Sequence, residues 1–485
     1  MQKEQIHNEV IKALVFYTNQ PAEDFNRPLS IEDFLKLPWV SLISGGIRIS
    51  SNRIAMYLIQ TYHILNIYGK LALYDEGYYQ KMSDTEWKAF IKEFMPKEYR
   101  NKRDWEDVLE ELKTEVPIAE NQLDTNENIV NLKNGIFLMD SGELGQHGSK
   151  YMSTIQLNAN YIPNSQIEDA PAINHYLDSL CTTEYAMETS DVDNDTKTLL
   201  LEFAGAIFSN VKGARYKKCL MLYGPSGAGK TQYRQLIINI LGKDNSLSLD
   251  LYRMQGTFGT GQIQGKRLIG TGDLPKATLP EMSVLKNLTG GDEIMIEAKY
   301  RDMYSGEFRG WLLYCANDLP HFGGNGEAIY NRFMIVPCTN RIPVEKQDSQ
   351  LIDKMMRERD IFVSVALDKF RETIKRGYKF TESDAVIAER KHYQKFNDSL
   401  TAFVTDHCNL NGKRMKRSTF NIVYQAWCKE NSYYTVPRNS IAKKLQELYG
   451  IEAVKINGEY YYNIEIDFGT LDKSEANYLY REYRY

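Results

Sequence analysis

The order of apolar and polar residues predicts an α/β fold in the middle of the chain. Short runs that are almost wholly apolar indicate buried strands, and five such runs occur at 219–223, 246–251, 267–273, 311–316 and 333–337. Residues 232–241 between the first two runs have helical periodicity. Strands that alternate with helices are typical of a parallel sheet. The pattern therefore predicts a parallel five-stranded sheet.

The residues before this sheet have the pattern of a mixed α+β module. We expect helices over 4–17, from Ile54 through Leu65, and within 84–115. A hairpin is expected over Leu71–Tyr79, and two short strands within 131–142, because turn residues punctuate both stretches. Residues 170–212 look mainly helical. Nothing before the sheet resembles a metal site or a nucleophile, so a docking or assembly role fits this module best.

The end of the chain has a different pattern. Helices are expected over 400–408, 418–431 and 439–449, followed by a hairpin over 454–462 that turns at Asn457-Gly458. Three helices and a β-hairpin are typical of a winged helix-turn-helix domain, which binds DNA. The alternative is a small protein-docking domain with a solvated basic face.

A glycine-rich segment follows the first predicted strand and precedes a predicted helix. Its sequence is Gly224-Pro225-Ser226-Gly227-Ala228-Gly229-Lys230-Thr231, which fits the phosphate-loop pattern G-x-x-x-x-G-K-[ST]. In that pattern backbone N–H groups surround phosphate oxygens, the lysine binds the β- and γ-phosphates, and the hydroxyl of the last residue binds Mg²⁺. The segment predicts a nucleotide triphosphatase that uses ATP and Mg²⁺.

Polar residues follow three of the other predicted strands. Asp273 is a candidate to hold Mg²⁺, to polarise the attacking water, or both; the alternative is an aspartate that begins a turn. Asp250 is a weaker candidate for the general base. Asn317 could orient the water through its amide. Arg332 could reach the γ-phosphate of a neighbouring subunit, although an arginine before a strand is also a common surface ion-pair partner.

The charge, the cysteines and the lengths of the apolar runs limit which partners and metals we expect. The chain of 485 residues has a formal net charge of -5, which argues against a wholly basic nucleic-acid coat. Residues 410–444, however, hold eight Lys or Arg against a single Glu. The six cysteines are far apart and show no metal-ligand spacing, so we expect reduced thiols and no zinc. No apolar run is long enough to cross a bilayer, and we expect a cytoplasmic protein without membrane contact.

Taken together, these motifs resemble superfamily 3 helicases, in particular the replication proteins of phages, plasmids, nucleocytoplasmic viruses and integrated mobile islands. The resemblance rests on Gly224–Thr231, Lys266–Asp273, Leu285–Asp292, Leu313–Pro320 and Asn331–Phe333, which occur in the order of that family. It covers about 120 residues strongly. Relatives commonly carry Glu or an acidic pair where this chain has Asp273, so the metal role transfers less safely than the fold.

The resemblance implies an AAA+ ATPase that forms a hexameric ring and moves 3′ to 5′ on DNA. It implies that Asp273 is the Walker B acid, Asn317 a sensor and Arg332 a finger that acts in trans on the next subunit. It also implies that a hairpin over 293–310 projects into the pore, where its tip, Lys299-Tyr300-Arg301, contacts single-stranded DNA.

We therefore expect five regions: an N-terminal α+β module (1–165), a helical linker or collar (166–215), an AAA+ core (216–345), a helical lid (346–395) and a winged-helix domain (396–485). Arg438, Lys443 and Lys444, with Asn439, lie on the candidate recognition helix and would bind origin duplex. The expected function is an ATP-dependent replicative DNA helicase and replication initiator, with a primase or other replication proteins as further partners. The alternative is an AAA+ protein remodeller or regulatory NTPase. A fused primase-helicase is disfavoured, because no D-x-D-type metal pair occurs in a strand context upstream.

Overall fold

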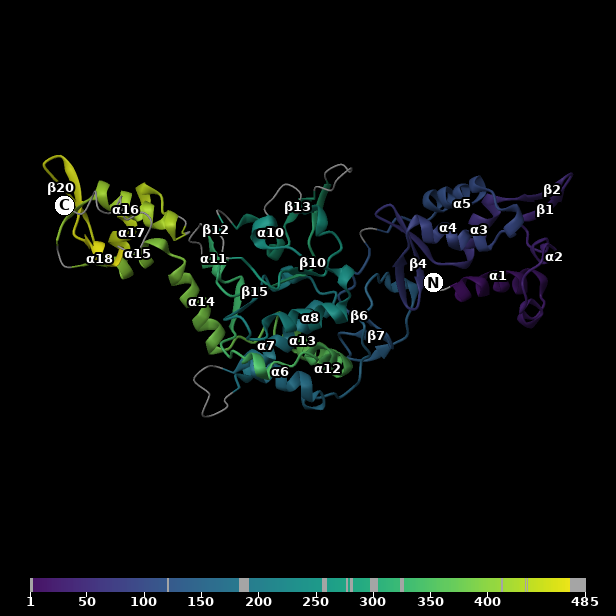
Figure 1. Cartoon of the computed structure of the whole chain (residues 1–485), viewed down its shortest axis with the longest axis horizontal. Coiled ribbons are helices and arrows are strands. Elements are labelled where there is room, and N and C mark those ends of the chain that lie inside the picture. The colour runs from purple at the N-terminus through teal and green to yellow at the C-terminus, as the bar shows by residue number, and fades with distance from the viewer. Residues whose placement is uncertain are drawn as a thin grey trace. The chain divides into compact units, whose positions relative to one another are not determined.

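The chain folds into two compact units. The computed structural model describes residues 3–119, 122–182, 192–254, 260–275, 278–279, 282–296, 304–322, 327–410, 413–431, 433 and 435–471. One unit comprises Met1–Leu138 with Glu143–Gln156, and the other comprises Met139–Gly142 with Leu157–Tyr485. Figure 1 shows the elements of both.

The first unit combines helices with small antiparallel sheets, as predicted. Its helices are α1 (Lys3–Thr18), α2 (Ile31–Phe34), α3 (Ser51–Thr61), α4 (Asp84–Glu93) and α5 (Lys102–Glu115). Its strands are β1 (Val40–Ile43), β2 (Gly46–Ile49), β3 (Ile64–Ile67), β4 (Lys70–Asp75), β5 (Tyr78–Lys81), β6 (Ile129–Leu132), β7 (Gly135–Leu138) and β8 (Leu144–Gly145). They form one two-stranded sheet, β1-β2, and two three-stranded sheets, β3-β4-β5 and β6-β7-β8.

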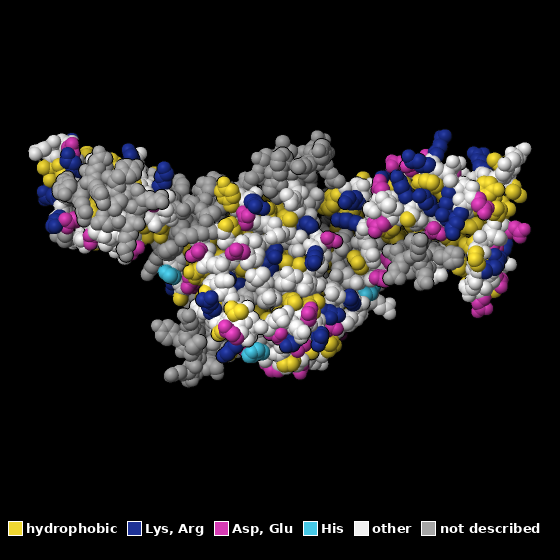
Figure 2. All heavy atoms as spheres, in the orientation of Figure 1, with side chains coloured by type: hydrophobic (Ala, Val, Ile, Leu, Met, Phe, Trp, Pro, Cys, Tyr) yellow, Lys and Arg dark blue, Asp and Glu magenta, His cyan; other side chains and the backbone are white. Residues whose placement is uncertain are grey.

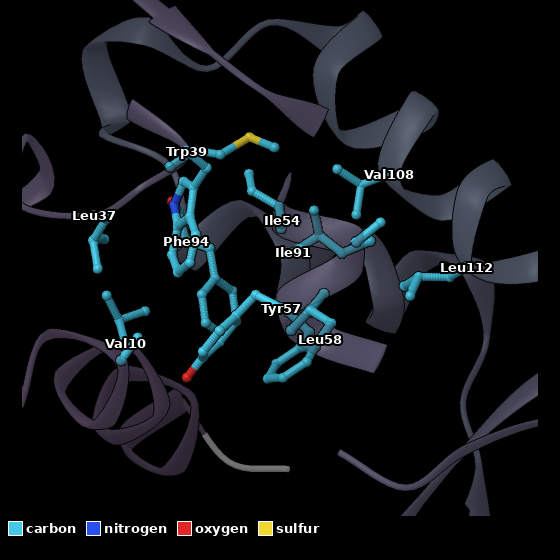
Figure 3. Close-up of a cluster of buried hydrophobic side chains, with 14 of the residues drawn as sticks. Val10, Leu37, Trp39, Ile54, Tyr57, Leu58, Ile91, Phe94, Val108 and Leu112 are labelled. Atoms are coloured by element: carbon cyan, nitrogen blue, oxygen red, sulfur yellow. The ribbon is translucent and has the colours of Figure 1, made fainter. Parts of the chain in front are cut away.

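The helices of this unit enclose an aromatic core. Trp39, Tyr57 and Phe94 lie together in it, with ring centroids 4.9 to 6.0 Å apart (Figure 3). The Trp39 indole N–H donates to the Phe94 carbonyl at 2.9 Å, so its polar atom is satisfied inside the core. The first unit therefore has a hydrophobic core of its own.

One helix prediction in this unit is wrong at its end. The helical pattern was extended from Ile54 through Leu65, but α3 ends at Thr61 and Ile64–Ile67 is strand β3, which pairs with β4. A run of four residues with three buried apolar side chains is too short to distinguish the two periods. The pairing of Ile64 with Leu73 across the hairpin determines which one forms.

A five-stranded parallel sheet organises the second unit, as predicted. Its order is β10-β11-β15-β9-β17, and all four pairings are parallel. The strands are β9 (Cys219–Tyr223), β10 (Ser246–Ser248), β11 (Leu268–Gly270), β15 (Trp311–Ala316) and β17 (Phe333–Pro337). The predicted strand over 246–251 is therefore too long, because Leu251 begins a short helix, α9 (Leu251–Met254).

Helices surround this sheet and lead out of it. They are α6 (Pro171–Cys181), α7 (Asn194–Phe208), α8 (Lys230–Leu241), α10 (Ser283–Gly290), α11 (Glu327–Tyr330), α12 (Leu351–Arg357), α13 (Arg359–Lys375) and α14 (Asp384–Phe396). Helices α7 and α13 pack closely: a Cβ on Gly205 would overlap the Ala366 carbonyl oxygen. Two short parallel strands, β12 (Thr278–Leu279) and β16 (His321–Phe322), pair beside the sheet.

The C-terminal part has the predicted three helices and hairpin. The helices are α15 (Ser399–His407), α16 (Arg417–Glu430), α17 (Arg438–Tyr449) and α18 (Phe468–Leu471). The strands are β18 (Cys408–Asn409), β19 (Met415–Lys416), β20 (Ala453–Ile456), β21 (Glu459–Tyr462) and β22 (Glu465–Ile466). Asn457 and Gly458 turn the β20–β21 hairpin with φ of 49° and 85°, as a type I′ turn requires. Strand β19 adds to the hairpin at β21, a pairing that the sequence pattern did not predict.

Candidate nucleotide-binding site

A tight glycine loop connects strand β9 to helix α8. Gly224, Gly227 and Gly229 have φ of 152°, 87° and 86°, which side-chain-bearing residues rarely adopt. A Cβ on Gly224 would overlap the backbone carbonyl of Cys338, and one on Gly229 would lie 3.3 Å from the Tyr176 ring. The backbone must therefore stay bare at these positions, as a loop that surrounds an anion with its N–H groups requires.

Lys230, the first residue of α8, turns its side chain back under the loop. Its Nζ donates to the carbonyl oxygens of Gly224 at 2.6 Å and Pro225 at 2.8 Å, and to Oδ1 of Asn317 at 3.0 Å. The residue is 6% exposed, and burial lowers the pKa of its ammonium group. All three acceptors are neutral. A nearly buried cation that hydrogen-bonds only neutral groups is suited to receive a negatively charged ligand.

Two predicted site residues, Lys230 and Asn317, are thus in direct contact although 87 positions separate them in the chain. The reason is the parallel sheet. Strand β15 pairs with β9, with Ala316 opposite Tyr223, so the residues that follow the two strands meet at the carboxyl edge of the sheet.

Thr231 and Asp273 place side-chain oxygen atoms near the same edge. The Thr231 hydroxyl donates to the Gly272 carbonyl at 3.2 Å, and Asp273 is the next residue, with an exposed side chain. A hydroxyl and a carboxylate from adjacent segments are hard oxygen donors, which Mg²⁺ prefers when it also keeps water and binds phosphate. The two residues fit Mg²⁺ in this respect.

The weaker candidate for the general base, Asp250, is engaged elsewhere. Its Oδ1 accepts from the backbone N–H of Arg253 at 2.7 Å, and Oδ2 lies 3.5 Å from Arg253 Nε. Asp250 thus caps helix α9. We do not retain it as a catalytic candidate.

Two further side chains hold backbone carbonyls at this edge of the sheet, one in the glycine loop and one at the end of β11, and the sequence pattern indicated neither. The Tyr176 hydroxyl of α6 donates to the Gly229 carbonyl at 2.9 Å, and Arg234 Nη2 of α8 donates to the Gly270 carbonyl at 2.8 Å. Tyr176 belongs to no motif, and only the fold brings it to the loop. Arg234 lies one helical turn after Lys230, and that spacing was an available signal.

Arg332 lies away from this group. It precedes β17, and its carbonyl accepts from the N–H of Cys219, the first residue of β9, at 2.7 Å. Strand β9 has five residues, which is a length of about 16 Å. Arg332 therefore lies at the edge of the sheet opposite the glycine loop. The length of the strand is greater than the reach of an arginine side chain, so Arg332 does not reach the loop of its own chain. Its Nη1 donates to the Thr289 hydroxyl at 2.6 Å.

The two strands of the hairpin predicted over 293–310 are confirmed. Strands β13 (Glu293–Ile296) and β14 (Tyr304–Glu307) pair in antiparallel fashion. At its base, Lys212 Nζ lies 2.5 Å from a Glu307 carboxylate oxygen. The tip residues Lys299, Tyr300 and Arg301 lie outside the described residues.

In space, carboxylates neutralise much of the basic C-terminal segment. Four of its eight cations have an acidic partner within 4 Å: Lys413 with Glu465, Lys416 with Glu459, Lys443 with Glu447, and Lys444 with Asp398. All four acids lie outside 410–444 in the sequence, so the charge count of that window overstated the basic character. On the face drawn in Figure 2, Lys and Arg side chains are likewise interspersed with Asp and Glu.

The predicted DNA-binding residues therefore differ in availability. Lys444 is half-buried, and its ammonium group lies 3.2 Å from the Asp398 carboxylate that caps α15. Lys443 is exposed and 3.8 Å from Glu447. Arg438 is exposed, and Nη2 donates to the neutral Gln425 at 3.0 Å. Arg417 donates to the Arg438 carbonyl at 3.4 Å, which places these two arginines side by side at the starts of α16 and α17.

No group of three or more His, Cys, Asp or Glu side chains in the described ranges is arranged to hold a metal ion. Over the same ranges, no helix is both long and apolar enough to span a bilayer.

Comparisons with known proteins match two stretches of the chain. Residues 222–350 match a family of unknown function (DUF5906), and residues 57–182 match the family described as D5 N terminal like. The first match covers the glycine loop, Asp273, Asn317 and Arg332. Each match covers less than half of the chain.

Among solved structures, the chain is similar to apo structures of the NrS-1 C-terminal region. The A-form structure is 12% identical with a TM-score of 0.45, over 85% of this chain and 99% of the other. A second apo structure of that region is 12% identical with a TM-score of 0.43, over 85% and 98%. At these scores the likeness adds no argument about function.

Proposed function

We propose that this chain is an ATP-dependent DNA helicase and replication initiator that works as a ring of identical subunits. The observation that carries the proposal is the contact of Lys230 with Asn317 beneath the glycine loop, at 3.0 Å. It brings together a cation for phosphates and an amide for water at the carboxyl edge of a parallel sheet, where α/β folds bind nucleotides. The D5 N terminal like match over residues 57–182 supports a relationship to phage primase-helicase-like replication proteins.

Each side chain at this edge has a role in the proposal. Lys230 and the backbone N–H groups of 224–231 bind the phosphates of ATP, and Thr231 and Asp273 bind Mg²⁺. Bound Mg²⁺ would neutralise charge that develops on the phosphates. Asn317 orients the attacking water. Asp273 polarises that water as well, or acts on the metal alone; both roles stay open.

The position of Arg332 favours the proposal that subunits form a ring. The residue lies at the edge of the sheet opposite its own glycine loop, so it is available to a nucleotide bound by a neighbouring subunit. The guanidinium is only partly buried, and burial lowers its pKa while Asp292 opposes that effect. The contact with Thr289 uses one N–H of Nη1, and a guanidinium has five N–H donors. The group can therefore bind a γ-phosphate on the next subunit. Six such subunits, moving 3′ to 5′, are the arrangement that the superfamily 3 resemblance implies.

DNA contacts are assigned to two places. Single-stranded DNA would meet the β13–β14 hairpin in the pore, and origin duplex would meet the C-terminal part, proposed to be a winged helix. Among the described residues, Arg417 and Arg438 have no carboxylate partner within 4 Å, and the two lie side by side. We therefore place the duplex contact on these arginines and on Lys443. We no longer favour Lys444, which is already paired.

The test is displacement of one strand from forked DNA by the purified chain with ATP and Mg²⁺. We expect unwinding by the wild-type protein and none by Lys230→Ala, whose DNA binding should remain measurable. ATP hydrolysis that DNA does not change, with no unwinding, would reject the helicase assignment.

One observation favours the alternative of an AAA+ remodeller that acts on proteins. Four of the eight cations of 410–444 are already paired with acids, which reduces the attraction of this surface for DNA. The salt dependence of DNA affinity separates the two functions. Several phosphate contacts require a steep fall in affinity with rising salt, whereas a remodeller would show a flat response.

A further inference from the structure

The contact between Thr289 and Arg332 joins two parts of the second unit that are far apart in sequence. Thr289 is the next-to-last residue of α10, and 43 positions separate it from Arg332. Its side chain is 3% exposed. The hydroxyl donates to the Leu285 carbonyl at 2.6 Å and accepts from Arg332 Nη1 at 2.6 Å. Because its hydrogen points into the helix, its lone pairs face the guanidinium.

The same end of α10 is the start of the hairpin. Gly291 ends the helix with φ of 78°, and a Cβ there would lie 2.7 Å from the Cβ of Ala214. Strand β13 begins at Glu293, two residues later. The chain therefore cannot loosen between Thr289 and β13 without moving the packed Gly291. The hairpin base, Thr289 and the arginine are thus joined through a short, packed segment.

We propose that Thr289 is a positioning residue that holds the Arg332 guanidinium and couples it to the base of the β13–β14 hairpin. This inference rests on the proposed function, in which Arg332 acts on the nucleotide of a neighbouring subunit and the hairpin binds DNA. Movement of DNA against the hairpin then changes where the arginine points. In this way, DNA bound to the hairpin of one subunit affects ATP hydrolysis at the site of its neighbour, to which that subunit contributes Arg332.

The test compares Thr289→Val, which removes the hydroxyl and keeps the shape, with Thr289→Ser, which keeps the hydroxyl. We expect Thr289→Val to lower kcat for ATP about 10- to 100-fold, because a hydrogen bond to a charged group has about that worth. KM for ATP should stay unchanged, and stimulation of turnover by DNA should be lost. Thr289→Ser should behave like the wild type.

Thr114→Val is the matched control. Thr114 is the next-to-last residue of α5, and its hydroxyl donates to the Glu110 and Glu111 carbonyls at 3.1 Å. It has the same local bonding as Thr289 without an arginine partner. This variant should keep wild-type kcat and DNA stimulation, which separates the effect of a lost helix hydroxyl from that of a misplaced arginine.

Mixing experiments give a second signature. Subunits with Lys230→Ala should contribute little turnover of their own but still offer an intact Arg332. They should therefore restore turnover to Thr289→Val, as they should to Arg332→Ala. If Thr289→Val folds poorly, the pair Thr289→Ala and Thr289→Ser isolates the hydroxyl in the same assays.

The outcomes distinguish a failure of the proposed function from a failure of the role proposed for Thr289. A wild-type protein without ATPase activity, or a fully active Arg332→Ala, overturns the proposed function. An impaired Arg332→Ala beside a Thr289→Val with wild-type kcat and DNA stimulation overturns the role of Thr289 alone. Equal losses in Thr289→Val and Thr289→Ser would also overturn it, because the hydroxyl would then not matter.

Discussion

The two edges of the five-stranded sheet carry different halves of one proposed site. At the carboxyl edge, Lys230 hydrogen-bonds two carbonyls and one amide. At the opposite edge, Arg332 hydrogen-bonds one hydroxyl. Within the part of the chain that the structure describes, neither cation has a hydrogen-bonded carboxylate, whereas Lys444 in the C-terminal part does. A cation's partners, more than the local charge count, indicate whether it is available to an anionic ligand.

The strongest effect is expected from the arginine edge. Arg332→Ala should lower kcat for ATP by about 10³ to 10⁵, the usual contribution of an arginine finger. Binding of a fluorescent ATP analogue should be nearly unchanged, because the residue lies away from its own chain's loop. A parallel loss of binding would place Arg332 in its own site and break the comparison between the edges.

The lysine edge should behave in the opposite way. Lys230→Ala should weaken ATP binding and lower turnover by about 10² to 10³, because it removes a charge placed at the phosphates. The measurement is calorimetric ATP affinity beside steady-state kcat. Lys113→Ala is the control, since that lysine pairs with Asp84 in the first unit, outside both the loop and the hairpin. Equal effects of the two variants would contradict a phosphate role for Lys230.

A smaller effect is expected for DNA. Arg438→Ala should weaken duplex binding severalfold at all sequences and reduce the slope of log affinity against log salt by about 0.9, the share of one phosphate contact. Titrations of labelled duplex at several salt concentrations measure both. An unchanged slope would move the contact away from the start of α17.

The smallest effect is expected for the paired lysine. Lys444→Met should leave DNA affinity and its salt slope unchanged and lower the free energy of unfolding by about 1 kcal/mol or less, because it removes one partly exposed ion pair. Denaturant unfolding measures the stability. A loss of DNA affinity equal to that of Arg438→Ala would show that the Asp398 pairing does not occupy this lysine.

The sequence predicted the parts whose signals are local. The glycine loop with its flanking strand and helix, the five apolar strands, and the Asn457-Gly458 hairpin each carry their signal within a few residues. The strand at Ile64–Ile67 was missed because a run of four residues, three of them apolar, fits both helical and strand periods. The pairing of Lys444 with Asp398 could not be foreseen, since the two are 46 positions apart.

The same limit applies to the candidate site. Asn317 was named because the end of a parallel strand has a defined place in the fold. Tyr176 and Thr289 belong to no strand end, and their partners lie 53 and 43 positions away. Asp250 was a weaker candidate than Asp273, named because it also lies near the end of a predicted strand, but a helix begins directly after it and uses its carboxylate as a cap. Such roles depend on contacts between residues that are distant in the chain, which local sequence patterns do not predict.

The most direct test of a site divided between subunits is the specific ATPase rate as a function of protein concentration, with the mass of the particles measured at each point. Because Arg332 must come from a neighbour, the rate per chain should fall steeply as the oligomer dissociates on dilution. A monomer that hydrolyses ATP at the full rate at every concentration would contradict the account.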